Sequence, residues 1–257
     1  MADYRFAEVE RHGRVTVVTL NRPERMNALH GPAHKELDAI FTAFDKDADQ
    51  WVGIVTGGGD RAFCAGNDLK AMSEGEDIRW GATGFGALTA RFGRQKPLIA
   101  AVNGIAMGGG FEIALACDLI LAVPEASFAL PEPRVGLAAL AGGLLRLPRA
   151  VGEKRAMDMV LTGRSVSAEE GRELGFVNQV HPADRLLPEA LQLAERIAEA
   201  SPLSIRASRA VLALGYDQPL EAASAEQMKL PAVRDLLASD HVREGPMAFA
   251  QKRKPDW

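Results

Sequence analysis

Residues 98–133 read LIAAVNGIAMGGGFEIALACDLILAVPEASFALPEP, and this stretch decides which fold the chain builds. Its first apolar run, Leu98–Val102, predicts a buried strand, and a second run, Leu119–Val123, predicts another. Between the two runs, three glycines at positions 108–110 precede a helix that begins near Phe111. The predicted order is therefore strand, glycine turn, helix, strand and an acidic loop around Glu132.

The glycine turn and two carboxylates together suggest an acid–base site. Glycine lets the backbone approach a ligand closely, and the first N–H groups of a helix lack intrahelical partners and favour negative charge. Glu112 lies in the first helical turn, and Glu132 stands between two prolines. Such an arrangement predicts proton transfer beside a carbonyl group. Simpler interpretations stay open: a tight turn, a glutamate placed for the helix dipole, and a solvated loop.

Composition limits the function further. The 257 residues form one large domain or one domain with an appendage, and 47% hydrophobic with 25% charged residues is typical of globular proteins. A net charge of −4 predicts no attraction to nucleic acid or to anionic membranes. Asn103, Glu112 and Asp118 argue against a membrane span, and no signal peptide is expected. With only two cysteines, Cys64 and Cys117, a cytoplasmic location is expected.

Apolar periodicity predicts elements in the rest of the chain. Strands are expected at 15–20, 51–56 and 176–180, and helices at 32–45, 85–95, 142–149, 153–161 and 167–174. Only helical patterns follow residue 183, at 185–200, 203–214, 218–239 and 242–253. We therefore predict an α/β core over residues 1–190 and a C-terminal helical region over residues 191–257.

Motifs of several other enzyme classes are missing from the sequence. No G-x-G-x-x-G follows the first strand, no G-x-x-x-x-G-K-[ST] occurs, and no G-x-S-x-G elbow marks a serine hydrolase. The five histidines form no H-E-x-x-H or other metal-ligand spacing. We therefore expect no metal site and no covalent catalysis.

Five groups of short motifs occur in order along the chain. They are Asn21-Arg22-Pro23 with Asn27-Ala28-Leu29; Ala62-Phe63-Cys64-Ala65-Gly66-Asn67-Asp68-Leu69; Asn103-Gly104 with Gly108-Gly109-Gly110-Phe111-Glu112; Ser127-Phe128 with Pro131-Glu132; and Glu244-Gly245-Pro246 with Lys252-Arg253-Lys254-Pro255. Together they resemble the enoyl-CoA hydratase/isomerase, or crotonase, superfamily, from about residue 10 to the last residue. Within it, the Phe-Ala-Leu-Pro-Glu loop and the Glu-Gly-Pro tail are similar to those of carnitinyl-CoA dehydratases.

The resemblance implies a fold, a substrate class and a mechanism. The fold would be a crotonase-like spiral of β-β-α units, followed by helices that assemble a homotrimer or a dimer of trimers. The substrate would be an acyl-CoA thioester, with no cofactor beyond the CoA that the substrate carries. By resemblance, the backbone N–H groups of Asn67 and Gly109 polarise the thioester carbonyl. Glu112 would hold the water, and Glu132 would move the proton between that water and the α-carbon.

The residues that bind CoA and substrate follow by the same resemblance. Arg25 and the backbone near Ala28 are similar to pantetheine and phosphate contacts, and Phe249 and Lys252 to residues that reach CoA from the same or a neighbouring subunit. For Arg25 and Lys252, plain surface charge is the alternative. Further contacts are expected from the Ala-Gly-Asn loop and from the residue before Glu132, namely Ala65, Asp68, Leu69 and Pro131.

The sequence departs from the family in the loop after the second glutamate. Many family hydratases have a proline-glycine step there, whereas this chain has Leu137-Ala138-Ala139-Leu140-Ala141-Gly142-Gly143, and Leu130 precedes Pro131. These changes concern the acyl tail rather than the chemistry. We expect a hydratase-type lyase; the alternatives are an enoyl-CoA isomerase, a carnitinyl-CoA dehydratase-like enzyme, and an RNA-binding or scaffold relative without turnover.

Overall fold

The computed structural model describes residues 4–75 and 77–257, and a six-stranded sheet carries the fold. Its strands, in spatial order, are β1 (Ala7–His12), β2 (Val15–Leu20), β3 (Val52–Gly57), β5 (Leu98–Val102), β7 (Leu119–Ala122) and β10 (Gln179–Val180). β1 pairs antiparallel with β2, and the other neighbours are parallel. The apolar runs of β2, β3 and β5 are almost entirely buried, as expected of parallel strands covered on both faces.

A second, four-stranded sheet is built from short strands. β4 (Ala62–Cys64) follows β3, β6 (Ile105–Met107) follows β5, and β8 (Ser127–Ala129) follows β7, with β9 (Val166–Ser167) antiparallel at the edge. Each passage of the chain thus adds one strand to each sheet before a helix or helical turn, which confirms the predicted spiral of β-β-α units. The sequence pattern missed β4, β6 and β8 because three residues are too few to show a period.

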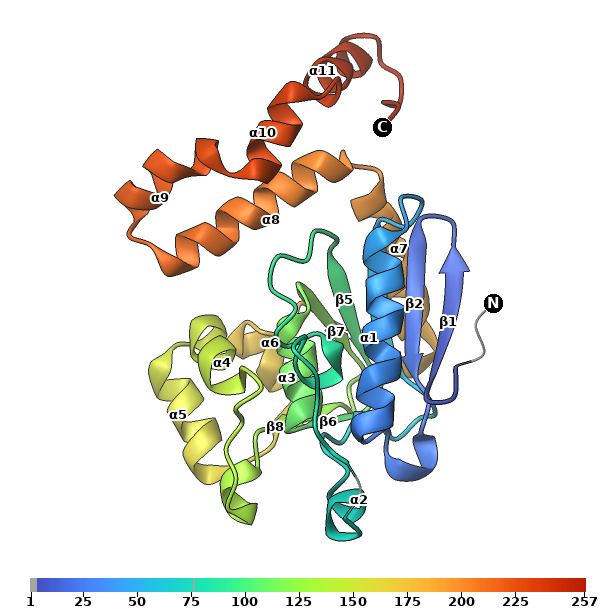
Figure 1. The fold of residues 1–257 in the computed structure, drawn as a ribbon, viewed down its shortest axis with the longest axis vertical. Helices are drawn as coiled ribbons and strands as arrows, with labels where there is room; N and C mark the ends of the chain where they lie inside the picture. Colours follow the sequence, from blue (N-terminus) through green and yellow to red (C-terminus); the bar gives the residue numbers. More distant parts are fainter. Residues whose placement is uncertain (1–3, 76) are drawn as a thin grey trace.

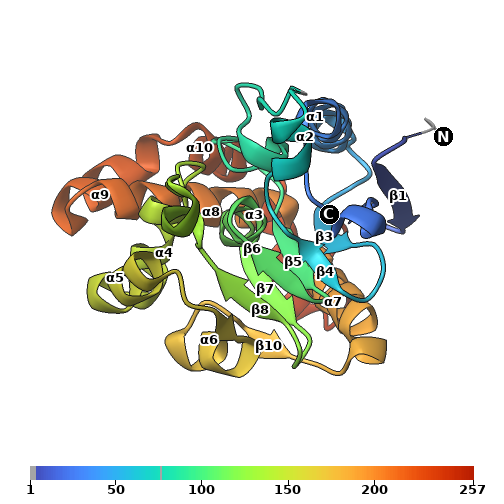
Figure 2. The ribbon, with the colours of Figure 1, turned by 90° about the horizontal axis from the view of Figure 1, so that it is seen from below.

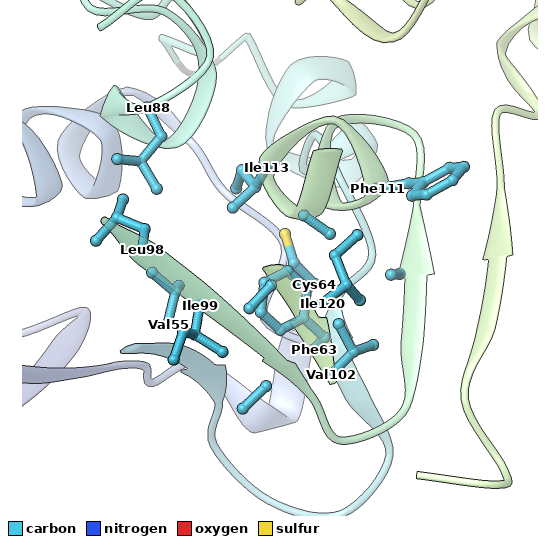
Figure 3. Packing of buried hydrophobic residues seen from close by; sticks show 14 of the residues in the cluster. Val55, Phe63, Cys64, Leu88, Leu98, Ile99, Val102, Phe111, Ile113 and Ile120 are labelled. Atoms are coloured by element: carbon cyan, nitrogen blue, oxygen red, sulfur yellow. The ribbon is translucent and has the colours of Figure 1, made fainter. Parts of the chain in front are cut away.

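The helix α3 (Gly109–Ala116) is anchored in the core between strands and neighbouring helices. It packs on β4, β5 and β6 and on α4 (Gly143–Val151), and Figure 2 shows α1 (Gly31–Lys46) and α4 on different sides of it. Figure 3 shows Ile113 of α3 above the buried side chains of Cys64 and Phe63. Each large apolar side chain buried in this way contributes about 1.5–3 kcal/mol, so α3 is held firmly.

The segment 85–95 does not form the predicted helix, and that prediction is wrong. Only a 3-10 turn, η2 (Phe85–Ala87), occurs there. Gly84, Gly86 and Ala87 have positive φ, which an α-helix cannot contain. Four further helices precede the C-terminal ones, namely α2 (Leu69–Ser73), α5 (Glu153–Thr162), α6 (Ala168–Leu174) and α7 (Ala183–Ala198).

Four C-terminal helices extend away from the sheets (Figure 1). They are α8 (Pro202–Asp217), α9 (Leu220–Glu226), α10 (Pro231–Ala238) and α11 (His241–Ala250). The single helix predicted over 218–239 is wrong, because a 3-10 turn (Gln227–Lys229) separates α9 from α10 and Pro231 begins the latter. The boundary predicted after residue 190 falls inside α7, which packs on the large sheet, and it stays a prediction. Within the described ranges, no helix is long and apolar enough to cross a membrane.

Candidate active site

Glu112 is a buried acid in the first turn of α3. Only 3% of the residue is exposed, and its Oε1 accepts a hydrogen bond from the Gly143 N–H at 2.8 Å. The pKa of Glu112 is raised to about 7: burial and the nearby Glu132 carboxylate raise it, whereas the Gly143 amide and Arg146 act in the opposite direction. The Glu112 carboxyl can therefore exist in both protonation states near neutral pH.

Glu132 approaches the same turn from another part of the chain. It begins the 3-10 turn η3 (Glu132–Val135), and its Oε1 lies so close to Gly108 that a Cβ added there would be 2.9 Å away. Its Oε2 is buried and has no hydrogen-bond partner among the described residues. Burial also raises the pKa of Glu132. Because each glutamate lies at the glycine turn at the start of α3 and the Glu132 carboxylate acts on the pKa of Glu112, the two acids are neighbours, and Oε2 of Glu132 is not engaged by another described residue.

The predicted oxyanion amides belong to two backbone segments that touch each other. Gly66 has a φ of +92°, and a Cβ added there would be 3.2 Å from the Gly109 nitrogen. Within the described part of the chain, the N–H groups of Asn67 and Gly109 donate to no acceptor. Two adjacent free N–H groups, one of them at a helix start, suit a developing negative charge on oxygen.

A salt bridge that sequence analysis did not find holds the Asn67 loop. Arg22 pairs with Asp68 at 3.1 Å, and Asp68 also accepts the Ala71 N–H as the N-cap of α2. Both partners are largely buried, so the Asp68 carboxylate is occupied by protein groups. Arg22 belongs to the Asn-Arg-Pro motif, which was the available signal, but no sequence pattern indicates that Asp68 is its partner.

Phe85 packs against the glycine turn from the opposite side. A Cβ added to Gly109 would be 2.6 Å from the Phe85 ring, so only glycine fits at this position. The backbone N–H of Gly86 donates to Nδ1 of His34 at 3.1 Å, which fixes the turn that carries Phe85. Burial lowers the pKa of His34 to about 4, so this ring stays neutral and keeps its acceptor.

The remaining predicted contacts divide into two groups. Half-buried Ala65 and exposed Leu69, at the start of α2, flank the Asn67 loop, the charge of exposed Arg25 acts on Asp68, and Arg22 donates to the carbonyl of buried Ala28. Half-buried Pro131 directly precedes Glu132. Leu29, next to Ala28, pairs with Asn67, which brings the two loops together. Phe249 and Lys252 lie on and just after α11, apart from α2 and α3 of the same chain (Figure 1). A contribution from a neighbouring subunit stays a prediction.

A metal centre was not expected, and the described residues contain no group of three or more His, Cys, Asp or Glu side chains that could hold one. The candidate site brings together two carboxyl groups and two backbone amides. Such a set can move protons while it stabilises an oxyanion.

Comparisons with known proteins agree over nearly the whole chain. The family model described as enoyl-CoA hydratase/isomerase matches residues 10–257. A carnitinyl-CoA dehydratase from Citrobacter koseri is 41% identical over 254 residues, 96% of each chain, and one from Proteus mirabilis is 42% identical over 253 residues, 95% of each.

Solved structures give the same result. An enoyl-CoA hydratase from Mycobacterium marinum superimposes with a TM-score of 0.92 at 40% identity, covering 98% of both chains. A carnitinyl-CoA hydratase from Mycobacterium avium has the same identity and a TM-score of 0.79 over 99% of both chains. By its sequence, its fold and the place of its glycine turn, this chain belongs to the enoyl-CoA hydratase/isomerase family.

Proposed function

We propose that this protein is an enoyl-CoA hydratase-type lyase, which adds water to the double bond of a 2-enoyl-CoA thioester or removes it from the 3-hydroxy compound. The observation that carries the proposal is the pair of glutamates at one glycine turn, buried Glu112 and half-buried Glu132, beside two unoccupied backbone amides. Relatives named enoyl-CoA hydratase and carnitinyl-CoA dehydratase support the same chemistry.

The proposed mechanism uses the amides of Asn67 and Gly109 to bind the thioester oxygen. The oxygen of a water held by Glu112 bonds to C3, and the electrons of the double bond move toward the thioester oxygen to give an enolate. Glu132 accepts a proton from the water and delivers it to C2, so that one water is added and both carboxyl groups return to their starting state. Each amide can stabilise the transition state by about 3 kcal/mol, judging from other oxyanion holes.

A dehydratase for a polar acyl group such as carnitinyl is the second candidate. The identity of 41–42% to carnitinyl-CoA dehydratases over almost the full length favours it. An enoyl-CoA isomerase, which shifts a double bond without water, is less favoured because both glutamates are present. The exposed side chains of Leu137 and Leu140, in the loop after Glu132, border the region where acyl groups would be distinguished.

Assembly, cofactors and location belong to the same proposal. We expect a homotrimer or a dimer of trimers, with no cofactor besides the CoA of the substrate and no nucleic-acid partner. The negative net charge supports the last point, and the two unpaired cysteines, Cys64 and Cys117, favour the cytoplasm.

The test is hydration of crotonyl-CoA by the purified protein, monitored as loss of the enoyl absorbance. In parallel assays, 3-enoyl-CoA tests for isomerase activity and carnitinyl-CoA for dehydratase activity. Glu112→Gln and Glu132→Gln should each lower kcat at least ~100-fold, because each loses an ionisable group needed for proton transfer. Glu125→Gln, at an exposed glutamate, should leave the rate unchanged. Full activity in either site variant refutes its role, and an RNA gel shift without crotonyl-CoA turnover would favour a binding protein.

A further inference from the structure

The turn at Ala141–Gly143 holds the Glu112 carboxylate. The Gly143 N–H donates to Oε1 at 2.8 Å, and the Ala141 N–H also stabilises the charged form. The approach is tight, because a Cβ added to Gly143 would lie 3.0 Å from this oxygen. Any movement of the turn therefore moves the hydrogen-bond donors of Glu112.

Arg146, one turn along α4, fastens this backbone in place. Its Nη2 donates to the Thr89 carbonyl at 2.7 Å, and its Nη1 lies directly against Gly142, which has a φ of +103°. Thr89 is buried in the segment that follows Phe85. The guanidinium thus connects the turn that holds Glu112 to the segment of Phe85 and Thr89, whose Phe85 ring packs on Gly109.

The charges around the two groups act in a definite direction. Burial raises the pKa of Glu112 most, and the Gly143 and Ala141 amides lower it; among charged groups, the Glu132 carboxylate raises it and the Arg146 guanidinium lowers it. Burial lowers the pKa of Arg146. Among nearby groups, Arg94 and Arg149 lower it further, whereas Glu112 and Cys117 raise it. Among these groups, Arg146 is the cation that offsets the burial of Glu112.

We propose that Arg146 is a positioning residue for Glu112. Its guanidinium holds the Ala141–Gly143 turn against Thr89, and so keeps two backbone amides directed at the Glu112 carboxylate and one positive charge near it. The inference rests on the proposed role of Glu112 as the acid that holds water. Without the clamp, the carboxylate loses stabilisation of its ionised form, and the fraction that is ionised at neutral pH falls.

The test compares Arg146→Met and Arg146→Lys with wild type, and uses Arg149→Met as a matched control. Arg149 follows on the same helix and is exposed, with a distant partner in Asp217 at 3.8 Å. Two readouts are taken: the pH profile of kcat/KM for crotonyl-CoA, and the pKa of Glu112 from carboxyl-carbon NMR, with Glu112→Gln to assign the signal. We expect Arg146→Met to raise the pKa of Glu112 by about one unit, with a matching shift of the pH profile. Arg146→Lys should shift it less, and Arg149→Met not at all.

The outcomes separate this inference from the proposed function. An unchanged Glu112 titration in Arg146→Met, or an equal shift in Arg149→Met, overturns the positioning role. If the methionine variant does not fold, the lysine variant decides the matter, because it keeps the charge but cannot bridge Gly142 and Thr89 in the same way. If wild type hydrates no thioester while the NMR shift appears as expected, the proposed function fails and the clamp stands.

Discussion

The two sheets and the C-terminal helices of this chain differ in how far they bury their large apolar side chains. β3 and β5 are buried at every position, and α7 packs on both of them within the same chain. The helices α8–α11 bury mostly small residues and expose large ones, among them Leu212, Tyr216, Leu220, Met247 and Phe249. The apolar side chains of the core are therefore covered by other parts of the same chain, whereas the C-terminal helices present an apolar surface of the kind that marks an interface.

The largest effect is expected where the core is tightest, at Gly110. A Cβ there would overlap the carbonyl oxygen of Cys64, a backbone atom of β4 that cannot move freely. Gly110→Ala should lower the free energy of unfolding by about 3 kcal/mol or more, measured by urea denaturation. It should also reduce activity, because β4 leads into the loop that carries Asn67. Wild-type stability in this variant would show that the two sheets are less tightly packed than their contacts indicate.

The next effect is the pH dependence of the free energy of unfolding that buried Glu112 causes. The pKa of Glu112 rises from 4.5 to about 7 on folding, so the folded state holds a proton that the unfolded chain releases. The stabilisation from this group is fully present below pH 4.5 and is lost as pH rises through 7, about 3 kcal/mol in all. Glu112→Gln should therefore be more stable than wild type at pH 8 by up to that amount, with little difference at pH 4.5. Equal pH dependence in both proteins would contradict the buried, protonated state.

The contrast also explains what the sequence could and could not predict. Long apolar runs predicted β2 and β5 at their observed bounds. The helix expected from Phe111 begins two residues earlier, at Gly109, so α3 includes two of the three glycines. Three-residue strands such as β4 were missed, and so was the break at Pro231, because the helical period on either side of it is continuous. Local patterns therefore sufficed where an element buries one continuous run.

The site divides in the same manner. The structure brings Glu112, Glu132 and the amides of Asn67 and Gly109 to one turn, and motifs in the sequence had named all four. The side chains that hold them, Arg22 and Arg146, were not named as such, because their partners are distant in sequence and visible only after folding. Sequence thus indicates the reacting groups more readily than the groups that position them.

A smaller effect of opposite sign is expected at Gly215 in α8. A Cβ there would meet no atom within 4 Å, and the residue is exposed. Because alanine favours helix over glycine, Gly215→Ala should stabilise the C-terminal region by about 0.5–1 kcal/mol. Hydrogen exchange of the α8 amides is the measurement, and Gly110→Ala is the contrasting variant from the core. Faster exchange in α8 would mean that Gly215 meets a partner that the single chain does not contain.

The smallest effect on the fold is expected from polar residues placed on the exposed apolar surface. Leu220 is 83% exposed and Phe249 87% exposed, so Leu220→Glu with Phe249→Ser should change the unfolding free energy of a single chain by less than ~0.5 kcal/mol. If these helices assemble a trimer, the same pair should shift the mass in light scattering toward the monomer, and unfolding should become independent of protein concentration. Glu221→Gln, an exposed neighbour in α9, should leave the assembly intact. An unchanged mass would place the subunit contacts elsewhere, and the exposed side chains of α9 and α11 would then need a different partner.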